Sequence, residues 1–169
     1  QTPMVKTLMF IGISILIVAT GFIPRYITGD EPHYLIIAQS IVTDFDVDLA
    51  DEYAAVPELT PHRAVMDRGF HSRHNMGLGL LLAVPWTIAG ERGAILMMNL
   101  LAVLFLLAFE DLLAVCKIPL RSRIVAVLSL AGCLPVLSFA SQIFPAIPGA
   151  LCVTLVLTEI LRYSSTQSC

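Results

Sequence analysis

The residues best suited to chemistry follow the first apolar run of the chain. Asp30 and Glu31 are adjacent acids inside the stretch GDEPHY at 29–34. A carboxylate at a membrane surface can act as a general base, or bind a cation or a sugar hydroxyl. The structural alternative is that both acids cap a helix, because Pro32 suits a first helical turn and the helix dipole favours acids there. The local pattern favours capping and leaves the chemical interpretation open.

A second group of acids follows at Asp46 and Asp48, in the stretch DFDVD at 44–48. Two aspartates at this spacing can chelate a divalent metal through their carboxylate oxygens. The stretch lacks the glycine and the closing glutamate of a calcium-binding hand loop. A solvated loop is therefore favoured, with Asp46 and Asp48 as weak metal candidates and no other cofactor indicated.

A third group is the stretch FHSRHNMG at 70–77, which contains His71, Arg73 and His74. Ser72 or Asn75 can cap a following helix, and the positive end of that helix could hold a phosphate with the help of Arg73. His74 could donate to the phosphate or shuttle a proton. The alternative is a histidine that only lies at the membrane interface.

Two further acids, Glu110 and Asp111, lie inside an apolar run. Ionisable groups within a membrane span normally indicate function. Both residues are close to one end of the run, however, so the favoured interpretation is that their side chains reach water.

The composition indicates the environment in which these groups work. The chain has 169 residues, of which 57% are hydrophobic and 14% charged, and its mean hydropathy is +0.83. These values exclude a soluble enzyme, a nucleic-acid binder and a disordered tail. Nine acids, four arginines and all four histidines fall between Arg25 and Asn75. One acidic, titratable segment thus interrupts a chain that belongs in lipid.

The apolar runs predict an all-α fold, a polytopic membrane helix bundle with about four transmembrane helices. A crossing needs about 20 helical residues. For the first run a signal peptide is the alternative, but no small-residue cleavage site precedes Arg25. We expect a single membrane domain with spans at 5–24, 94–115, 124–140 and 145–162, an extracytoplasmic loop at 25–76 with an interfacial helix at 32–42, and a short re-entrant or interfacial helix at 77–89.

The basic residues predict the orientation, because short cytoplasmic loops carry an excess of lysine and arginine. An arrangement of four spans has a cytoplasmic amino terminus. It places five basic residues on the cytoplasmic side: Lys6, Lys117, Arg121, Arg123 and Arg162. A fifth span at 77–89 would move three of them outside. The acidic segment and the histidines are therefore expected at the outer face.

At these motifs the chain resembles a known family. The first span and its GDEPHYL at 29–35, then DVDL at 46–49, DEY at 51–53, HSRHNMGL at 71–78 and SQIFP at 141–145, followed by PGA at 148–150, are similar in order to polytopic GT-C glycosyltransferases. The nearest likeness is to bacterial members akin to protein O-mannosyltransferases and the lipid A aminoarabinose transferase. The likeness extends from about Leu8 to Leu161.

The resemblance implies an inverting glycosyltransferase of a bacterial inner membrane. Its donor would be a polyprenyl-phosphate-linked sugar, and its acceptor an unidentified lipid, glycan or protein at the extracytoplasmic face; membrane lipids would be partners and nucleic acid would not. The motif carries the role of catalytic base to Asp30, with Glu31 as its neighbour. The residues implied for substrate binding are Tyr34, His71, Arg73, His74 and Gln142.

Two positions depart from the family pattern. Ala146 stands where an acid often follows the corner, and Gly79 stands where a proline is common. Members of this family also have many more spans, so we expect the chain to be an amino-terminal part that is inactive alone. The alternative functions are a segment of a transporter and a membrane scaffold without catalysis.

Overall fold

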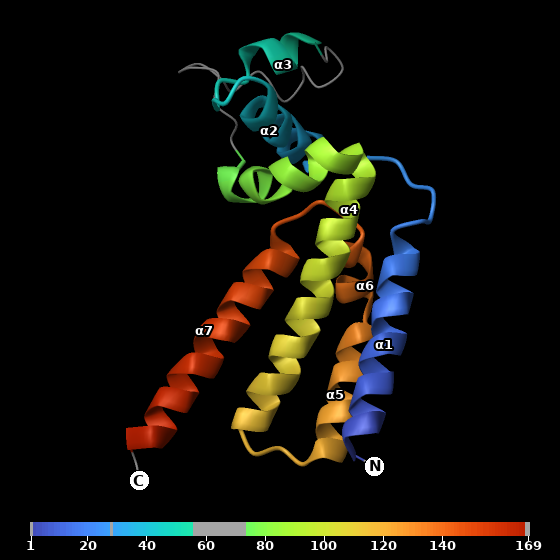
Figure 1. Ribbon diagram of the computed structural model, residues 1–169, viewed down its shortest axis with the longest axis vertical. Coiled ribbons are helices and arrows are strands. Elements are labelled where there is room, and N and C mark those ends of the chain that lie inside the picture. The colour runs from blue at the N-terminus through green and yellow to red at the C-terminus, as the bar shows by residue number, and fades with distance from the viewer. Residues whose placement is uncertain (1, 28, 56–73, 168–169) are drawn as a thin grey trace. The chain divides into compact units, whose positions relative to one another are not determined.

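The chain is entirely helical in the part that the structure describes. The computed structural model describes residues 2–27, 29–55 and 74–167, and no strand occurs among them (Figure 1). The helices are α1 (Thr2–Thr20), α2 (Glu31–Thr43), α3 (Ala50–Ala55), α4 (Met76–Val115), α5 (Leu120–Ala131), α6 (Leu134–Ala140) and α7 (Ala146–Gln167). The predicted all-α class is confirmed. The chain divides into two compact units, with unit 1 formed by 1–23 and 98–169 and unit 2 by 24–97.

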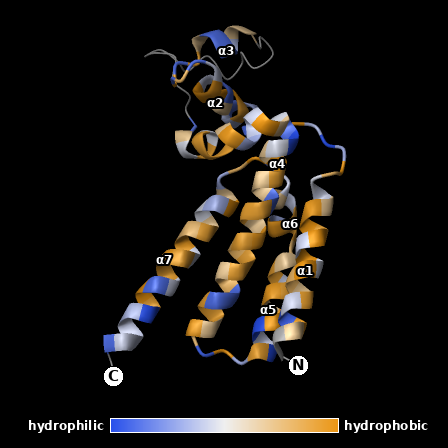
Figure 2. Ribbon diagram, in the orientation of Figure 1, coloured by the Kyte–Doolittle hydropathy of each residue, from blue (hydrophilic) through white to orange (hydrophobic). Residues whose placement is uncertain are grey.

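Two of the described helices, α4 and α7, are long and apolar enough to cross a membrane. The pair α5 and α6 adds a third candidate if it counts as one span. Apolar residues dominate most of α1 as well (Figure 2), but its apolar stretch Met4–Thr20 is shorter than a full crossing. The structure therefore supports a helical membrane bundle with two or three full-length candidates, where the sequence predicts about four.

The span expected at 124–140 is not one straight helix. It divides into α5 and α6, which are bent by 61° relative to each other. Gly132 closes α5 and Pro135 lies in the first turn of α6. A proline there lacks the amide hydrogen that would continue the preceding helix, so the break follows from the sequence. At the far end of α6 the buried Asn99 side chain donates a hydrogen bond to the Ala140 carbonyl at 2.7 Å, which satisfies a backbone group left open where the helix stops.

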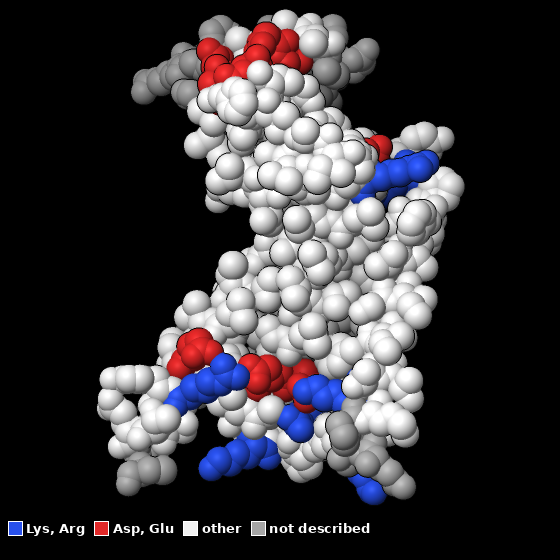
Figure 3. Space-filling view, viewed as in Figure 1, with Lys and Arg blue, Asp and Glu red and all other residues white. Residues whose placement is uncertain are grey.

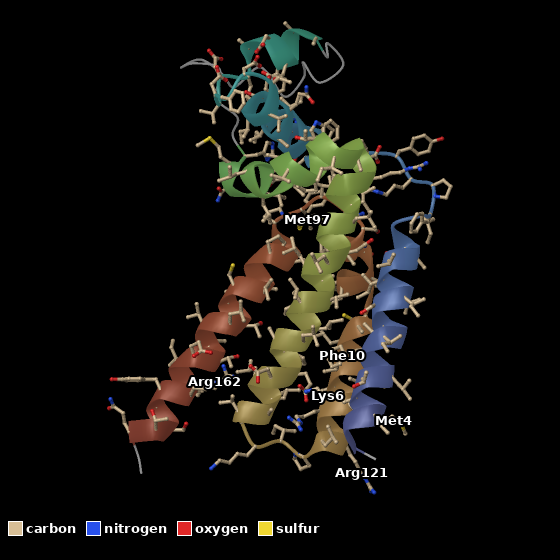
Figure 4. All side chains as sticks on the ribbon, in the orientation of Figure 1. Met4, Lys6, Phe10, Met97, Arg121 and Arg162 are labelled. Carbon is tan, nitrogen blue, oxygen red and sulfur yellow. The ribbon has the colours of Figure 1, made fainter. Side chains whose placement is uncertain are left out.

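The charged residues of unit 1 gather where α4 and α5 meet (Figure 3). The side chain of Glu110 is only 4% exposed and lies 2.5 Å from Lys6 Nζ and 3.2 Å from Arg123 Nη1. The sequence favours an interpretation in which Glu110 reaches water. In the structure Glu110 is buried instead, and cations from α1 and α5 neutralise it. Asp111 is half-exposed and pairs with Arg162 of α7 at 2.5 Å. Figure 4 labels Lys6 and Arg162 at this end of unit 1.

The core of unit 2 forms where α2 meets α3 and the segment that joins them. It consists of Ile36, Ile37, Leu49 and Tyr53, with Ile41 packed against them. Ile37 is 1% exposed, and so is Leu49. This packing fixes the orientation of α2 and hence of the residues at its amino end.

Helix α4 changes direction within unit 2. Ala89 and Gly90 have non-helical backbone angles, and Gly90 has a φ of +58°, which favours glycine. At Gly93 a Cβ would lie 1.9 Å from the Pro85 carbonyl oxygen, so only glycine fits the inside of this bend. The two segments expected at 77–89 and 94–115 are thus the two arms of one interrupted helix.

Gly79 allows the first arm of α4 to contact α2 closely. A Cβ at this position would lie 2.3 Å from Ile37 Cγ2 and 2.7 Å from Ile37 Cβ. Two turns further along α4, Trp86 Nε1 donates a hydrogen bond to Gln39 Oε1 at 2.6 Å. The glycine that departs from the family pattern therefore has a packing reason in this chain.

Gly79→Ala is expected to separate the first arm of α4 from α2, because the branched Ile37 side chain and its backbone leave no room for a methyl group. Overpacking of this kind costs about 1–3 kcal/mol. Trp86 is the only tryptophan of the chain, so its fluorescence reports this separation. Its emission should shift to longer wavelength, and thermal unfolding followed by this emission should be less cooperative. Gly77→Ala is the matched control, because its Cβ would meet only Asn75 Oδ1 at an ordinary 3.4 Å. Equal behaviour of the two variants would contradict the close contact.

Glu110→Gln is expected to destabilise unit 1 by about 3 kcal/mol, because Lys6 and Arg123 lose the charge that neutralises them in apolar surroundings. Asp111→Asn removes a half-exposed pair and should cost no more than about 1 kcal/mol. Thermal unfolding followed by circular dichroism in lipid nanodiscs measures both. A larger loss for Asp111→Asn than for Glu110→Gln would contradict the role assigned to Glu110.

Candidate functional site

The amino end of α2 holds the two acids that the sequence singles out. Asp30 is the residue before the helix, Glu31 begins it, and Pro32 occupies its first turn. The Asp30 side chain makes no capping hydrogen bond, and it is 49% exposed. The capping interpretation is therefore wrong for the Asp30 carboxylate, which stays available to solvent.

Glu31 lies in a different environment from its neighbour. It is 1% exposed, and Arg25 Nη1 donates a hydrogen bond to its Oε1 at 2.6 Å. A buried carboxylate is costly unless a cation neutralises it. Arg25, the first charged residue after α1, supplies that cation and ties the connecting segment to α2. Glu31 is thus bound to a structural partner, and Asp30 is the accessible acid of the pair.

An imidazole faces the Asp30 carboxylate. His74 Nε2 lies 4.0 Å from Asp30 Oδ1. The His74 ring stacks on the His33 ring with centroids 4.8 Å apart and an interplanar angle of 17°, and the edge of Tyr34 meets it at 5.2 Å. Two aromatic contacts therefore hold the His74 ring beside Asp30. We call Arg25, Asp30, Glu31, His33, Tyr34, Tyr53 and His74 the Asp30 cluster.

A buried hydrogen bond holds the His33 ring of this stack in place. His33 Nδ1 and Tyr53 Oη are 2.6 Å apart, and both residues are less than 5% exposed. Tyr53 belongs to α3, so this bond links the Asp30 cluster to the core of unit 2. The His33 ring, on which His74 stacks, thus depends on Tyr53, which lies 20 residues further along the chain than His33.

Burial raises the pKa of Tyr34 above its ordinary value of 10.0, and the negative charge of Asp30 raises it further. An anion is disfavoured both in an apolar environment and beside another anion. The Tyr34 hydroxyl therefore remains protonated at neutral pH and can act as a hydrogen-bond donor beside the Asp30 carboxylate.

The arrangement gives the Asp30 cluster a defined chemical capacity. A half-exposed carboxylate can accept a proton from a hydroxyl group, and the neighbouring imidazole can orient that hydroxyl or bind an anion. The Nε and Nη2 atoms of Arg25 have no hydrogen-bond partner among the described residues. A guanidinium edge of this kind matches two oxygens of a phosphate or carboxylate. A carboxylate that can accept a proton and cationic groups that can bind an anion thus lie together in unit 2.

The structure brings together Asp30, Glu31, Tyr34 and His74 of the predicted site residues. His71 and Arg73 lie outside the described residues. Gln142 belongs to unit 1, where it is half-buried in the turn before α7.

The metal candidates Asp46 and Asp48 have local structural partners. Asp46 Oδ1 accepts hydrogen bonds from Ser40 Oγ at 3.1 Å and from the Asp48 amide at 3.0 Å. Asp48 Oδ1 accepts one from the Ala50 amide at 3.2 Å, where α3 begins. The two carboxylates thus shape the turn between α2 and α3. Neither belongs to the group of three acids whose ligand oxygens lie within 4.8 Å of one another among the described residues.

Sequence reasoning missed Arg25, His33 and Tyr53. Arg25 carried a signal, because it is the first charge after an apolar run and lies six residues before Glu31. His33 is inside the quoted motif, but its burial could not be seen there. Tyr53 had no signal beyond its presence in a short acidic stretch.

Asp30→Asn is expected to lower the pKa of Tyr34 while leaving it above the ordinary value, because the charge disappears and the burial remains. An alkaline titration of tyrosine absorbance measures this when the spectra of Tyr34→Phe and of the double variant are subtracted. Tyr26 is 91% exposed and serves as the internal reference. An unchanged Tyr34 pKa in Asp30→Asn would show that the two groups do not interact.

Comparisons with known proteins add nothing to this geometry. No protein-family model matches the chain, no curated protein matches its sequence, and no solved structure matches its fold. The resemblance to GT-C glycosyltransferases therefore stays a prediction, and the candidate site rests on the described residues of the Asp30 cluster.

Proposed function

We propose that this chain is part of a membrane glycosyltransferase that moves a sugar from a polyprenyl-phosphate-linked donor to an acceptor hydroxyl. Asp30 is the general base. A polyprenyl phosphate leaves readily and keeps its tail in the bilayer, so the acceptor must attack at the membrane surface. A base and anion-binding groups at the start of an amphipathic helix suit such a reaction through proximity and charge stabilisation.

The observation that carries the proposal is the difference between two adjacent carboxylates. Glu31 is buried and bound to Arg25, whereas Asp30 is half-exposed and makes no capping bond. An acid that removes a proton from a substrate must be reachable by that substrate. Asp30, half-exposed and with His74 Nε2 4.0 Å away, meets this condition.

The donor phosphate is assigned to His74 and Arg25. His74 lies beside Asp30, and two nitrogens of Arg25 have no hydrogen-bond partner among the described residues. Charge-assisted hydrogen bonds from such groups stabilise a phosphate better than neutral donors do. Arg73 is the further candidate from the sequence. In this proposal Asp30 removes the proton of the acceptor, and the neighbouring His74 and Arg25 bind the phosphate of the leaving group.

The site is assigned to the extracytoplasmic face. Lys6 and Arg123 lie together around Glu110 in unit 1, at the end where α4 leads into α5. Lys117 is in the turn after α4 and Arg121 in the first turn of α5. A concentration of basic residues in a short connection favours the cytoplasmic side, which gives the amino terminus to the cytoplasm and the loop after α1 to the outside of a bacterial inner membrane.

One feature favours the alternative of a transporter. Transporters carry broken helices at the bilayer midplane, where polar groups bind substrate or ions, and α5 and α6 form a broken pair. No acidic, basic or histidine residue occurs between Ile124 and Ala140, however. The buried Asn99 side chain donates to the end of α6, which gives it a structural use. The glycosyltransferase proposal therefore retains the stronger support.

Asp30→Asn is expected to reduce sugar transfer by at least about a hundredfold, the lower range for loss of a general base. The measurement is transfer of a radiolabelled sugar from its polyprenyl phosphate in membranes that contain the full-length protein. Amounts of inserted protein are matched by immunoblot. The asparagine keeps the shape of the side chain and cannot accept the proton.

Two further variants make the result specific. Asp111→Asn is the same change at a half-exposed pair in unit 1 and should keep the activity of the unmodified protein. Glu31→Gln should lower the amount of folded protein, because the buried Arg25 loses its partner. Full transfer activity of Asp30→Asn would exclude Asp30 as the base.

A further inference from the structure

Three carboxylates outside the Asp30 cluster meet where α2 turns into α3. Asp44 closes α2, and Asp51 and Glu52 lie in the first turn of α3. One ligand oxygen from each of the three lies within 4.8 Å of the others. We call these residues the Asp44 cluster. Like charges at such distances repel one another, so the arrangement requires compensation.

Glu52 is the member that makes compensation necessary. The residue is 8% exposed, and neither of its carboxylate oxygens has a hydrogen-bond partner among the described residues. Burial raises the pKa of Glu52 to about 7, and the adjacent Asp51 carboxyl contributes to this increase. Two carboxylates can approach closely only if a proton or a cation lies between them. The Glu52 carboxyl group, which is buried close to two further acids and has no basic partner among the described residues, is an open ligand.

The surrounding sequence supplies no cation of its own. No lysine or arginine occurs from Tyr26 to His62. Arg25, which precedes this stretch, is paired with Glu31. None of the three acids forms an ion pair with a basic side chain in the described part of unit 2. The Thr43 hydroxyl donates a hydrogen bond to Asp44 Oδ2 at 2.8 Å.

We propose that Asp44, Asp51 and Glu52 bind one divalent cation, and that this cation is Ca²⁺. The ion would join the end of α2 to the start of α3. Those two helices also carry His33 and Tyr53, whose hydrogen bond supports the Asp30 cluster. The cation therefore has a structural role in unit 2 and takes no part in transfer chemistry. The sequence directs attention to Asp46 and Asp48 instead, but these acids are engaged by Ser40 and by backbone amides.

Three carboxylate oxygens within 4.8 Å of one another can be bridged by Ca²⁺ without being drawn closer together. Ca²⁺ binds oxygens at about 2.4 Å and accepts irregular geometry, so two ligands on opposite sides of the ion lie about 4.8 Å apart. Mg²⁺ requires about 2.1 Å and a nearly ideal octahedron, which would draw opposite ligands to about 4.2 Å. Three carboxylates leave further ligand positions for water. Such an open site is expected to bind with a dissociation constant on the order of 10⁻⁴ to 10⁻³ M.

The test measures Ca²⁺ binding to the full chain in nanodiscs of uncharged lipid after removal of metals with EDTA. Equilibrium dialysis with labelled calcium gives affinity and stoichiometry. Trp86 gives an independent signal, because it lines the same cavity of about 420 Å³ as Glu52 and is the only tryptophan. We expect one saturable ion per chain, a higher unfolding temperature by Trp86 fluorescence in Ca²⁺, and binding of Mg²⁺ that is roughly tenfold weaker or more.

Glu52→Gln and Asp44→Asn are both expected to weaken Ca²⁺ binding at least about tenfold, because each removes one of three charged ligands. Glu91→Gln is the matched control; it removes one acid of unit 2 outside the Asp44 cluster and should bind as the unmodified chain does. A normal Trp86 emission spectrum without calcium verifies that each variant is folded. Absence of saturable binding up to 5 mM, roughly the upper limit for weak sites, would overturn the proposal. Unchanged affinity in both Glu52→Gln and Asp44→Asn would overturn it as well, and would assign the binding to other acids.

Discussion

The structure depends on one constraint, that a charged group leaves water only together with a partner. Glu110 satisfies it in unit 1, where its carboxylate lies between Lys6 and Arg123. Glu31 satisfies it in unit 2 through Arg25. In both cases the acid is on one helix and the cation comes from another segment, so neutralising the charge also joins the two segments. Packing of apolar side chains between helices has no such directionality in lipid, where the solvent is as apolar as the side chains.

The same constraint explains why the adjacent carboxylates of Asp30 and Glu31 lie in different environments. Glu31 is buried as part of the fold, and its ion pair joins the segment at Arg25 to α2 within unit 2. Asp30 lies one residue earlier, outside the helix, and needs no partner because half of its side chain remains in water. Its environment is set by what surrounds it: the stacked rings of His33 and His74 and the buried Tyr34. A half-exposed carboxylate therefore lies directly beside one that a buried ion pair holds in place.

Much of the fold was accessible from hydropathy, because apolar length and turn residues act locally. The helix at 31–43, the bend near Gly90 and the turn around Lys117 all follow from neighbouring residues. Gly132 and Pro135 also indicate a break locally, but the apolar run around them led to the prediction of one continuous span. What the sequence could not provide were pairs far apart in the chain. Lys6 and Glu110 are separated by 104 residues and His33 and Tyr53 by 20, and no periodicity links them. Of the Asp30 cluster, the sequence singled out Asp30, Glu31, Tyr34 and His74. It did not indicate that Arg25 would pair with Glu31 or that Tyr53 would hold His33.

Gly79 shows how such a distant contact can change the meaning of a local pattern. Compared with the glycosyltransferase pattern, Gly79 is a departure at a position where proline is common. In the fold it lies against Ile37, where any side chain would collide with α2. The Trp86 to Gln39 hydrogen bond on the same pair of helices requires that closeness. A departure from a family pattern therefore carries information only when the contact made by that residue is known. Here the contact is one of packing against α2, the helix that Asp30 precedes and Glu31 begins.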